Sequence, residues 1–253
     1  MEGELAAGAP YEVRSRRHAV AAAPFKKLDR VAALAIVFVT AHVVLDVFAV
    51  VTDVQMVGLL NRAKAGELVT IEEADALDVR MARIGLMQSL GVLITGIPFI
   101  VWFRRVYRNL PALGIRWLRF KLGWAVGGWF VPFLSVARPK SVVNDVWRAT
   151  DPSLPREVDE PPAGGHVSPL LNWWWAAFVV SGFLYAGGSG AFEARPSLDE
   201  LLWEAQRYAF ADAISIAAGI LAILVIRRVT ARMQMRHAVV SAAEGATPTA
   251  LGG

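Results

Sequence analysis

Five apolar stretches alternate with charged segments along the chain, and each is long enough to enter a membrane. They cover residues 31–52, 84–103, 122–137, 172–192 and 208–226. Apolar runs of about 20 residues have the length that a helix needs to cross the hydrocarbon core of a bilayer. Because no water satisfies the backbone there, such runs must form helices. The pattern therefore predicts an all-α, polytopic membrane protein.

The third stretch differs from the other four. Residues 122–137 would cover only about 24 Å as a helix, at about 1.5 Å per residue, whereas the core measures about 30 Å. Glycine and proline weaken a helix further. We therefore expect a re-entrant or interfacial segment, and its turn-prone motif comprises Gly127, Gly128, Trp129, Phe130 and Pro132.

The distribution of Lys and Arg distinguishes two topologies. With four spans, twenty basic residues lie on one side of the membrane and six on the other; with five spans, the numbers are fourteen and twelve. Basic residues concentrate on the cytoplasmic side of membrane proteins, and tryptophan favours the interfaces. Eight of the nine tryptophans lie between residues 102 and 175 and would share that interface. These patterns favour four spans in a plasma membrane, with both termini cytoplasmic.

The spans form two predicted helical hairpins within a membrane domain, 31–237. Thr70 with Glu73 and Ser197 with Glu200 form capping boxes, so helices are expected to begin there and to continue into the second and fourth spans. The remaining parts are a disordered basic segment (1–30), an interfacial region (104–150), a linker (151–171) and a disordered tail (238–253).

A short helix is expected to begin at Pro139. One face of it carries Val142, Val143, Val146 and Trp147, whereas polar residues occupy the other faces. This amphipathic pattern is typical of a helix that lies in the membrane interface.

Charge and composition narrow the function. The chain is 55% hydrophobic, has a net charge of +4 and contains no cysteine. Because the basic residues flank the apolar runs, we expect an anionic lipid partner and no nucleic acid; the alternative is charge that only sets topology. The basic cluster comprises Arg104, Arg105, Arg108, Arg116, Arg119 and Lys121.

Two aspartates lie inside the spans, Asp46 and Asp212, and His42 lies one turn from Asp46. A charge in the bilayer costs at least about 2.5 kcal/mol, so such residues face protein or water and mark candidate functional sites. One interpretation is a polar pocket or a proton-coupled step. The other is a structural hydrogen-bonded cluster, or acids close enough to the interface to be hydrated.

Residues 104–152, followed by the Trp-rich run from Leu170, carry a more specific pattern. An Arg- and Asn-bearing helix end precedes a Gly and a Trp-Phe-x-Pro core, and a Pro-initiated helix then ends in Trp. The residues are Arg108, Asn109, Gly123, Trp129, Phe130, Pro132, Pro139 and Trp147. Over about 84–226 the chain resembles a bacterial membrane family known as domain of unknown function 4328. The resemblance implies this architecture and no activity.

These observations favour a membrane-embedded scaffold or interaction protein that engages anionic lipid at the cytoplasmic face and that associates with itself as a possible homo-oligomer. The alternative is a small transporter or channel component that uses His42, Asp46 and Asp212. The sequence contains no phosphate-binding loop, no nucleophile–base order and no metal motif. We therefore expect no enzyme, no metal and no cofactor.

Overall fold

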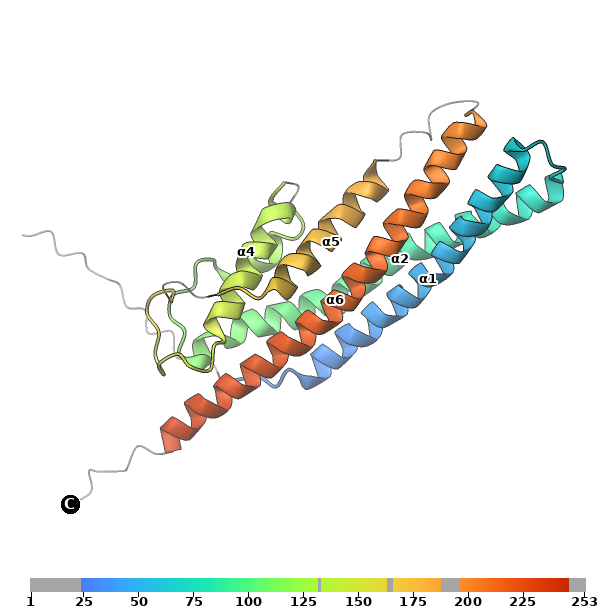
Figure 1. The fold of residues 1–253 in the computed structure, drawn as a ribbon. Coiled ribbons are helices and arrows are strands. Elements are labelled where there is room, and N and C mark those ends of the chain that lie inside the picture. The colour runs from blue at the N-terminus through green and yellow to red at the C-terminus, as the bar shows by residue number, and fades with distance from the viewer. Residues whose placement is uncertain (1–23, 132, 163–165, 188–195, 246–253) are drawn as a thin grey trace, which may run out of the picture.

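The computed structural model describes residues 24–131, 133–162, 166–187 and 196–245, with side chains up to Ala243. Within these ranges the chain is helical, and its extended pairing is limited to one isolated bridge between Ile115 and Val158. The predicted all-α class is confirmed. The helices (Figure 1) are α1 (Asp29–Lys64), α2 (Ile71–Asn109), the 3-10 turn η1 (Pro111–Leu113), α3 (Leu122–Gly127), α4 (Leu134–Ala149), α5 (Pro169–Ala186) and α6 (Leu198–Gly245).

Two long helices begin at the capping boxes that the sequence indicates. The backbone N–H of Glu73 donates to Thr70 Oγ1 at 3.2 Å and starts α2. At α6 the capping is reciprocal, because Glu200 N donates to Ser197 Oγ at 3.3 Å and Ser197 N donates to the Glu200 carboxylate at 2.6 Å. Each box satisfies amide groups that have no partner in the first helical turn. Both predicted helix starts are confirmed.

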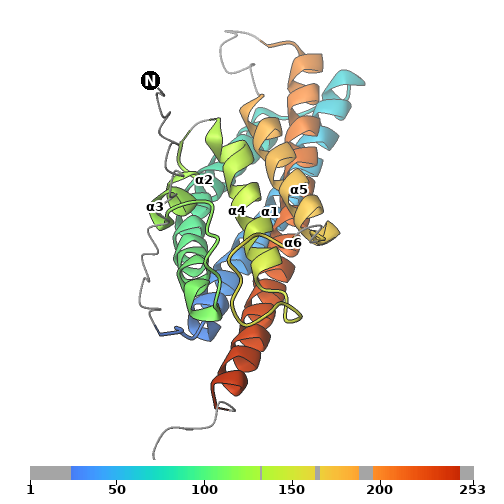
Figure 2. The same cartoon turned by 90° about the vertical axis from the view of Figure 1, so that its left-hand side faces the viewer.

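Helix α1 lies between α2 and α6, and α5 packs along α6 (Figures 1 and 2). The contacts keep a constant antiparallel register along each pair. Between α1 and α6 they join Asp29 to Gln234, Val43 to Gly219, Asp46 to Ser215 and Lys64 to Asp199. Between α1 and α2 they join Phe38 to Thr95, Asp46 to Gln88 and Arg62 to Glu73. One end of the bundle therefore gathers the start of α1, the end of α2 and the C-terminal part of α6.

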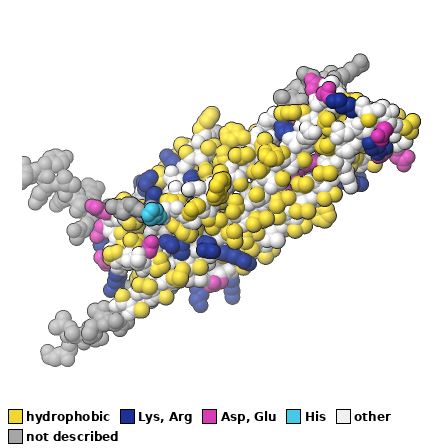
Figure 3. All heavy atoms as spheres, in the orientation of Figure 1, with side chains coloured by type: hydrophobic (Ala, Val, Ile, Leu, Met, Phe, Trp, Pro, Cys, Tyr) yellow, Lys and Arg dark blue, Asp and Glu magenta, His cyan; other side chains and the backbone are white. Residues whose placement is uncertain are grey.

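Helices α1, α2 and α6 are long and apolar enough to cross a membrane, whereas α5, with 18 residues, is not one of these three. In their most apolar windows only 22%, 11% and 33% of the residues are buried inside the protein. Hydrophobic side chains cover the middle of the bundle, and charged side chains gather toward its ends (Figure 3). Soluble proteins rarely expose so much contiguous apolar surface, whereas a multi-pass membrane protein requires it.

Residues 122–137 do not form one continuous helix. Helix α3 ends at Gly127, a turn follows, and Phe133 has a φ of 62° just before α4. Helix α4 begins at Leu134 rather than at the expected Pro139, because Ser135 N–H already donates to the Val131 carbonyl at 2.9 Å. A proline inside a helix removes one backbone donor, and α4 tolerates that loss.

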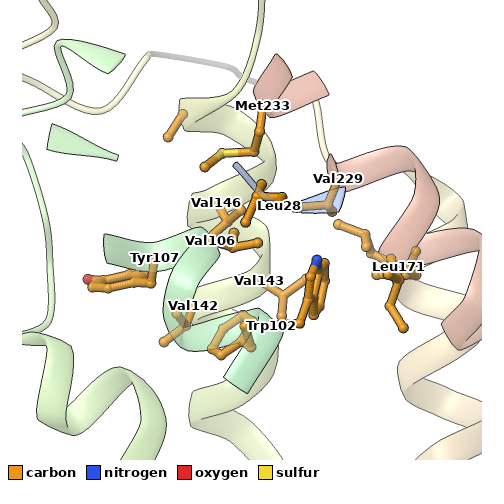
Figure 4. Close-up of a cluster of buried hydrophobic side chains, with 14 of the residues drawn as sticks. Leu28, Trp102, Val106, Tyr107, Val142, Val143, Val146, Leu171, Val229 and Met233 are labelled. Carbon is orange, nitrogen blue, oxygen red and sulfur yellow. The ribbon is translucent and has the colours of Figure 1, made fainter. Parts of the chain in front are cut away.

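The expectation that the apolar face of α4 lies on the membrane is wrong. Val142, Val143 and Val146 are at most 4% exposed and belong to the main hydrophobic core. Figure 4 shows them facing side chains such as Trp102 of α2 and Met233 of α6. An amphipathic pattern reports that a helix has an apolar neighbour and does not distinguish lipid from protein.

Several of the tryptophans between residues 102 and 175 pack against other rings inside the protein. Trp129 packs against Phe99, Trp174, Trp175 and Phe178, with ring centroids 5.2 to 6.4 Å apart. Of the eight between residues 102 and 175, two are more than half exposed, Trp124 and Trp173. The aromatic side chains therefore join α2, the segment after α3 and α5 into one internal cluster of offset and edge-to-face rings.

Helix α6 continues beyond the predicted end of the membrane domain. Residues 238–245 extend the helix instead of forming a disordered tail, and residues 246–253 lie outside the described residues. The helix continues because its C-terminal part contacts protein: His237 stacks on Phe25 at 4.0 Å. Within the predicted disordered segment 1–30, residues 1–23 are not described, and Leu28 is fully buried.

Candidate functional site

Asp46 and Asp212 meet inside the helix bundle. One Gln88 amide nitrogen donates to Asp46 Oδ1 at 3.0 Å and to Asp212 Oδ1 at 2.6 Å. The two aspartates are 0% and 2% exposed. Because α1 and α6 run antiparallel in constant register, residues at equal depth face each other, and Gln88 reaches both from α2. The fold thus brings together two of the three residues singled out in the sequence.

The third, His42, lies beside Asp46 at the edge of the cluster. Its Nε2 is 3.7 Å from Asp46 Oδ1, and its side chain is 15% exposed. Nδ1 is buried without a hydrogen-bond partner. A Cβ added at Gly91 of α2 would lie 2.8 Å from Nδ1. The absent side chain of Gly91 therefore provides the space in which the imidazole lies.

Hydroxyl groups provide further hydrogen bonds to the two carboxylates. Ser215 Oγ donates to Asp46 Oδ2 at 2.8 Å, and the Tyr185 hydroxyl of α5 donates to Asp212 Oδ1. Four helices thus contribute to one polar site. We call this site the carboxylate cluster, comprising His42, Asp46, Asp53, Gln88, Tyr185, Asp212 and Ser215.

Asp53 is a member that the sequence analysis missed. It is 5% exposed and shares the α1 face of Asp46, whose partner Ser215 lies one turn from Asp212. Its Oδ2 is buried without a hydrogen-bond partner. Asp53 lies two helical turns after Asp46 and hence on the same face of α1. This seven-residue spacing was the available signal, but the first predicted span ended at Thr52.

In the described part of the chain, no Lys or Arg forms an ion pair with a residue of the carboxylate cluster. Carboxylates taken out of water need hydrogen bonds or compensating charge, because desolvation penalises the ionised form strongly. Here the compensation comes from neutral donors on Gln88, Tyr185 and Ser215, and from the imidazole. Such an arrangement can hold, donate or accept protons.

The basic cluster of residues 104–121 divides into two groups. Arg116 pairs with Glu157 at 2.9 Å, Arg119 pairs with Asp145 at 3.2 Å, and Arg105 donates to the Lys27 carbonyl. By contrast, Arg104, Arg108 and Lys121 are exposed and form no ion pair with a described residue. The second group therefore keeps its charge available to a ligand, whereas each cation of the first group already contacts a partner.

The motif at 127–132 contributes one partly buried and one exposed ring. Trp129 belongs to the internal aromatic cluster, whereas Phe130 is 71% exposed. Gly128 lies against the Arg138 side chain, and Gly127 has open space around it. Pro132 lies outside the described residues. With Trp124 and Phe133, which are 51% and 92% exposed, Phe130 forms what we call the apolar tip.

Two arginines of α6 hold the layer formed by η1, α4 and the linker. The guanidinium of Arg236 is fully buried and donates to four backbone carbonyls, those of Leu113, Asp151, Leu154 and Pro155, at 2.9 to 3.2 Å. The Arg232 guanidinium lies 4.3 Å from the Trp147 ring centroid. The sequence placed both in a cytoplasmic tail and gave no sign of these contacts.

Titratable groups of this layer have shifted pKa values. Burial lowers the pKa of Lys140 to about 8, aided by the nearby charge of Arg148. Burial also raises the pKa of Asp145, although Arg119 and Arg148 oppose the shift. Hydrogen bonds from Ser153 lower the pKa of Asp151. Within the described residues, these groups do not converge on one catalytic centre.

Comparison with known proteins adds a family. The chain shows no significant similarity to a curated protein or to a solved structure. Residues 65–231 match the family described as Domain of unknown function (DUF4328). The match includes α2 to α5 and most of α6, and hence Gln88, Tyr185 and Asp212, but not α1 with Asp46 and Asp53. Because it covers more than half of the sequence, the chain belongs to the DUF4328 family.

Proposed function

We propose that this protein is a four-span scaffold of the bacterial plasma membrane that engages anionic lipid at its cytoplasmic face. The spans are α1, α2, α5 and α6, and both termini are cytoplasmic. Two observations support α5 as a span. Its 18 residues would cover about 27 Å. The Tyr185 hydroxyl, near the C-terminal end of α5, donates a hydrogen bond to Asp212 of α6. The C-terminal ends of α1 and α5 then face outward.

The basic end of the bundle supports the orientation. We use this name for the end that carries Arg30, Arg104, Arg108, Arg227 and Arg228, all of which are exposed. The Trp102 indole N–H donates to Thr230 Oγ1 at 3.1 Å, which places the end of α2 beside residue 230 of α6. The arginines of three helices therefore lie at similar depth, where positive charge marks the cytoplasmic side.

Two features together support lipid engagement. One is the set of exposed cations that form no ion pair with a described residue, and the other is the apolar tip. Arg104, Arg108 and Lys121 offer charge to headgroups, and each contributes about 1 kcal/mol near an anionic surface. Phe130 and Phe133 are exposed at 71% and 92%. Such rings are costly in water and favourable at the boundary between headgroups and acyl chains.

Native mass spectrometry of the purified protein tests lipid engagement. We expect retained phosphatidylglycerol or cardiolipin in the wild type and a several-fold loss in the double variant Arg104→Gln, Arg108→Gln. The matched control is Arg80→Gln, Arg83→Gln, which removes two charges from the opposite end of the same helix. Equal lipid retention in the two double variants at low salt would show that the basic cluster only sets topology.

A second candidate function is a small transporter or channel component, and the carboxylate cluster favours it. Ionisable residues within membrane helices mark ion or proton pathways in many membrane proteins. A groove of about 630 Å³ at the start of α2 includes none of the cluster residues, so access to the cluster must be measured directly. Proton flux through the protein in proteoliposomes provides this measurement.

A further inference from the structure

We propose that Asp53 and Asp212 bind one proton between them and so form a proton-binding site within the membrane domain. The ligand is a single hydrogen ion, taken up without any change in covalent bonds, and its binding changes the charge of the pair from −2 to −1. The proposal rests on the second candidate function for its physiological role. It is independent of lipid engagement at the basic end.

The distribution of hydrogen-bond donors within the cluster points to this pair. Asp46 accepts from Gln88 and Ser215 and has His42 nearby. Asp212 accepts from Gln88 and Tyr185 through one oxygen. Among the described residues Asp53 has no such donor, although it is only 5% exposed, and its Oδ2 has no partner there. A proton on Asp53 would supply the missing donor toward Asp212.

The same conclusion follows from electrostatics. Two ionised carboxylates in contact repel each other, and burial amplifies the repulsion, so such a pair is most stable when it holds one proton. In the aspartic-protease dyad two carboxylates share a proton for this reason. Here Asp53 lies on the same face of α1 as Asp46, and Asp212 lies one turn from Ser215, the α6 residue that donates to Asp46. The two buried aspartates therefore both lie in the contact between α1 and α6, where the charge of Asp212 acts on Asp53. One proton removes the repulsion and joins the two helices by a strong hydrogen bond.

The charged and titratable groups that the structure describes around the pair include no Lys or Arg that forms an ion pair with it. On α1 these groups are His42 and Asp46, which lie together at one side of the pair. Tyr185 faces it from α5 and donates to Asp212. Arg80 of α2 donates to Gln55 at 2.7 Å. Arg207 of α6 is held by Glu204 and by the Leu184 carbonyl.

A proton fits this site better than a metal ion. Metal cations bind through oxygen lone pairs, but here hydrogen-bond donors already point at the carboxylate oxygens. Asp46 and Asp212 accept these hydrogen bonds from the amide of Gln88 and from the hydroxyls of Tyr185 and Ser215. In addition, the described residues include no group of three His, Cys, Asp or Glu side chains arranged to hold a metal.

Infrared spectroscopy of the full-length protein in lipid nanodiscs tests the proposal. The wild type should show a protonated-carboxyl C=O band near neutral pH that shifts in D₂O. Asp53→Asn should abolish this band, because its amide supplies the donor to Asp212 and no shared proton is needed. The control Asp78→Asn, which changes an exposed acid of α2, should retain the band. Absence of the band in the wild type, or an equal band in Asp53→Asn, would overturn the proposal.

The wild-type D₂O measurement requires no variant, so misfolding of a variant leaves the test intact. A second measurement addresses the candidate transport function separately. Proteoliposomes with a trapped pH-sensitive dye report proton flux for the wild type and for Asp53→Asn. Flux that Asp53→Asn abolishes would support transport through this site. If the wild type shows the protonated-carboxyl band but no proton flux, the proton-binding site has a structural role and the transport function is excluded.

Discussion

Gly219 of α6 and Val43 of α1 are in such close contact that a Cβ added at Gly219 would lie 2.3 Å from Val43 Cγ2. Small residues allow membrane helices to approach closely, and this approach provides much of their packing energy. The contact lies one turn from Ser215 and Asp46, which are hydrogen-bonded. The glycine therefore sets the spacing at which the two helices of the carboxylate cluster can share hydrogen bonds.

Replacing this glycine should separate α1 from α6. We expect Gly219→Ala to lower the free energy of unfolding by about 1–3 kcal/mol, because valine is stiff and the backbones must move apart. The matched control is Gly58→Ala in α1, where nothing lies within 4 Å of the added Cβ and alanine favours the helix by about 1 kcal/mol. Thermal unfolding in detergent measures both. Equal stability of the two variants would show that α1 and α6 can adjust at no cost.

Arg236 should be the residue on which the layer at the basic end depends most. Arg236→Lys keeps the charge, but one ammonium group cannot reach the four carbonyls that the planar guanidinium reaches. Unsatisfied buried groups cost about 1–3 kcal/mol. Hydrogen–deuterium exchange should accelerate in residues 113–116 and 151–158, whereas Arg228→Lys, an exposed site on the same helix, should leave exchange unchanged. Unchanged exchange in Arg236→Lys would mean that the layer holds itself together.

Lys140 gives a pH dependence with a defined sign. Its pKa is about 8 in the folded protein and 10.5 ordinarily. Between these values the unfolded chain binds more protons than the native state, so stability rises with pH in this window. The apparent Tm of the wild type should therefore increase relative to Lys140→Gln between about pH 8 and pH 10.5. A difference between the two proteins that stays constant with pH would contradict the shift.

Local signals in the sequence predicted the elements of this fold well. Thr70 and Ser197 start their helices because a capping box needs only residues three apart. The meeting of Asp46 with Asp212 followed from equal depth in antiparallel helices, which hydropathy and topology together provide. The orientation of His42 toward Asp46 followed from the four-residue spacing on one helix.

The features that sequence reasoning missed depend on partners far along the chain. Asp53 was placed outside the span because the predicted apolar stretch ends at Thr52, although α1 itself continues to Lys64. The apolar face of α4 was assigned to lipid, since its pattern does not reveal that Trp102 and Met233 cover it. Arg236 looked like a cytoplasmic charge because backbone carbonyls leave no trace in the side-chain pattern.

The four-span topology can be tested with cysteines, which the chain lacks. Three exposed positions distinguish the alternatives: Glu67 in the turn after α1, Ser153 in the linker and Pro196 before α6. An impermeant thiol reagent added to intact cells should label Glu67→Cys and Pro196→Cys. Ser153→Cys should react only after the membrane is permeabilised, because the linker lies beside Arg232 and Arg236 at the basic end. Labelling of Ser153→Cys in intact cells would place the basic end outside and exclude this orientation, and protection of Pro196→Cys would show that α5 does not cross the membrane.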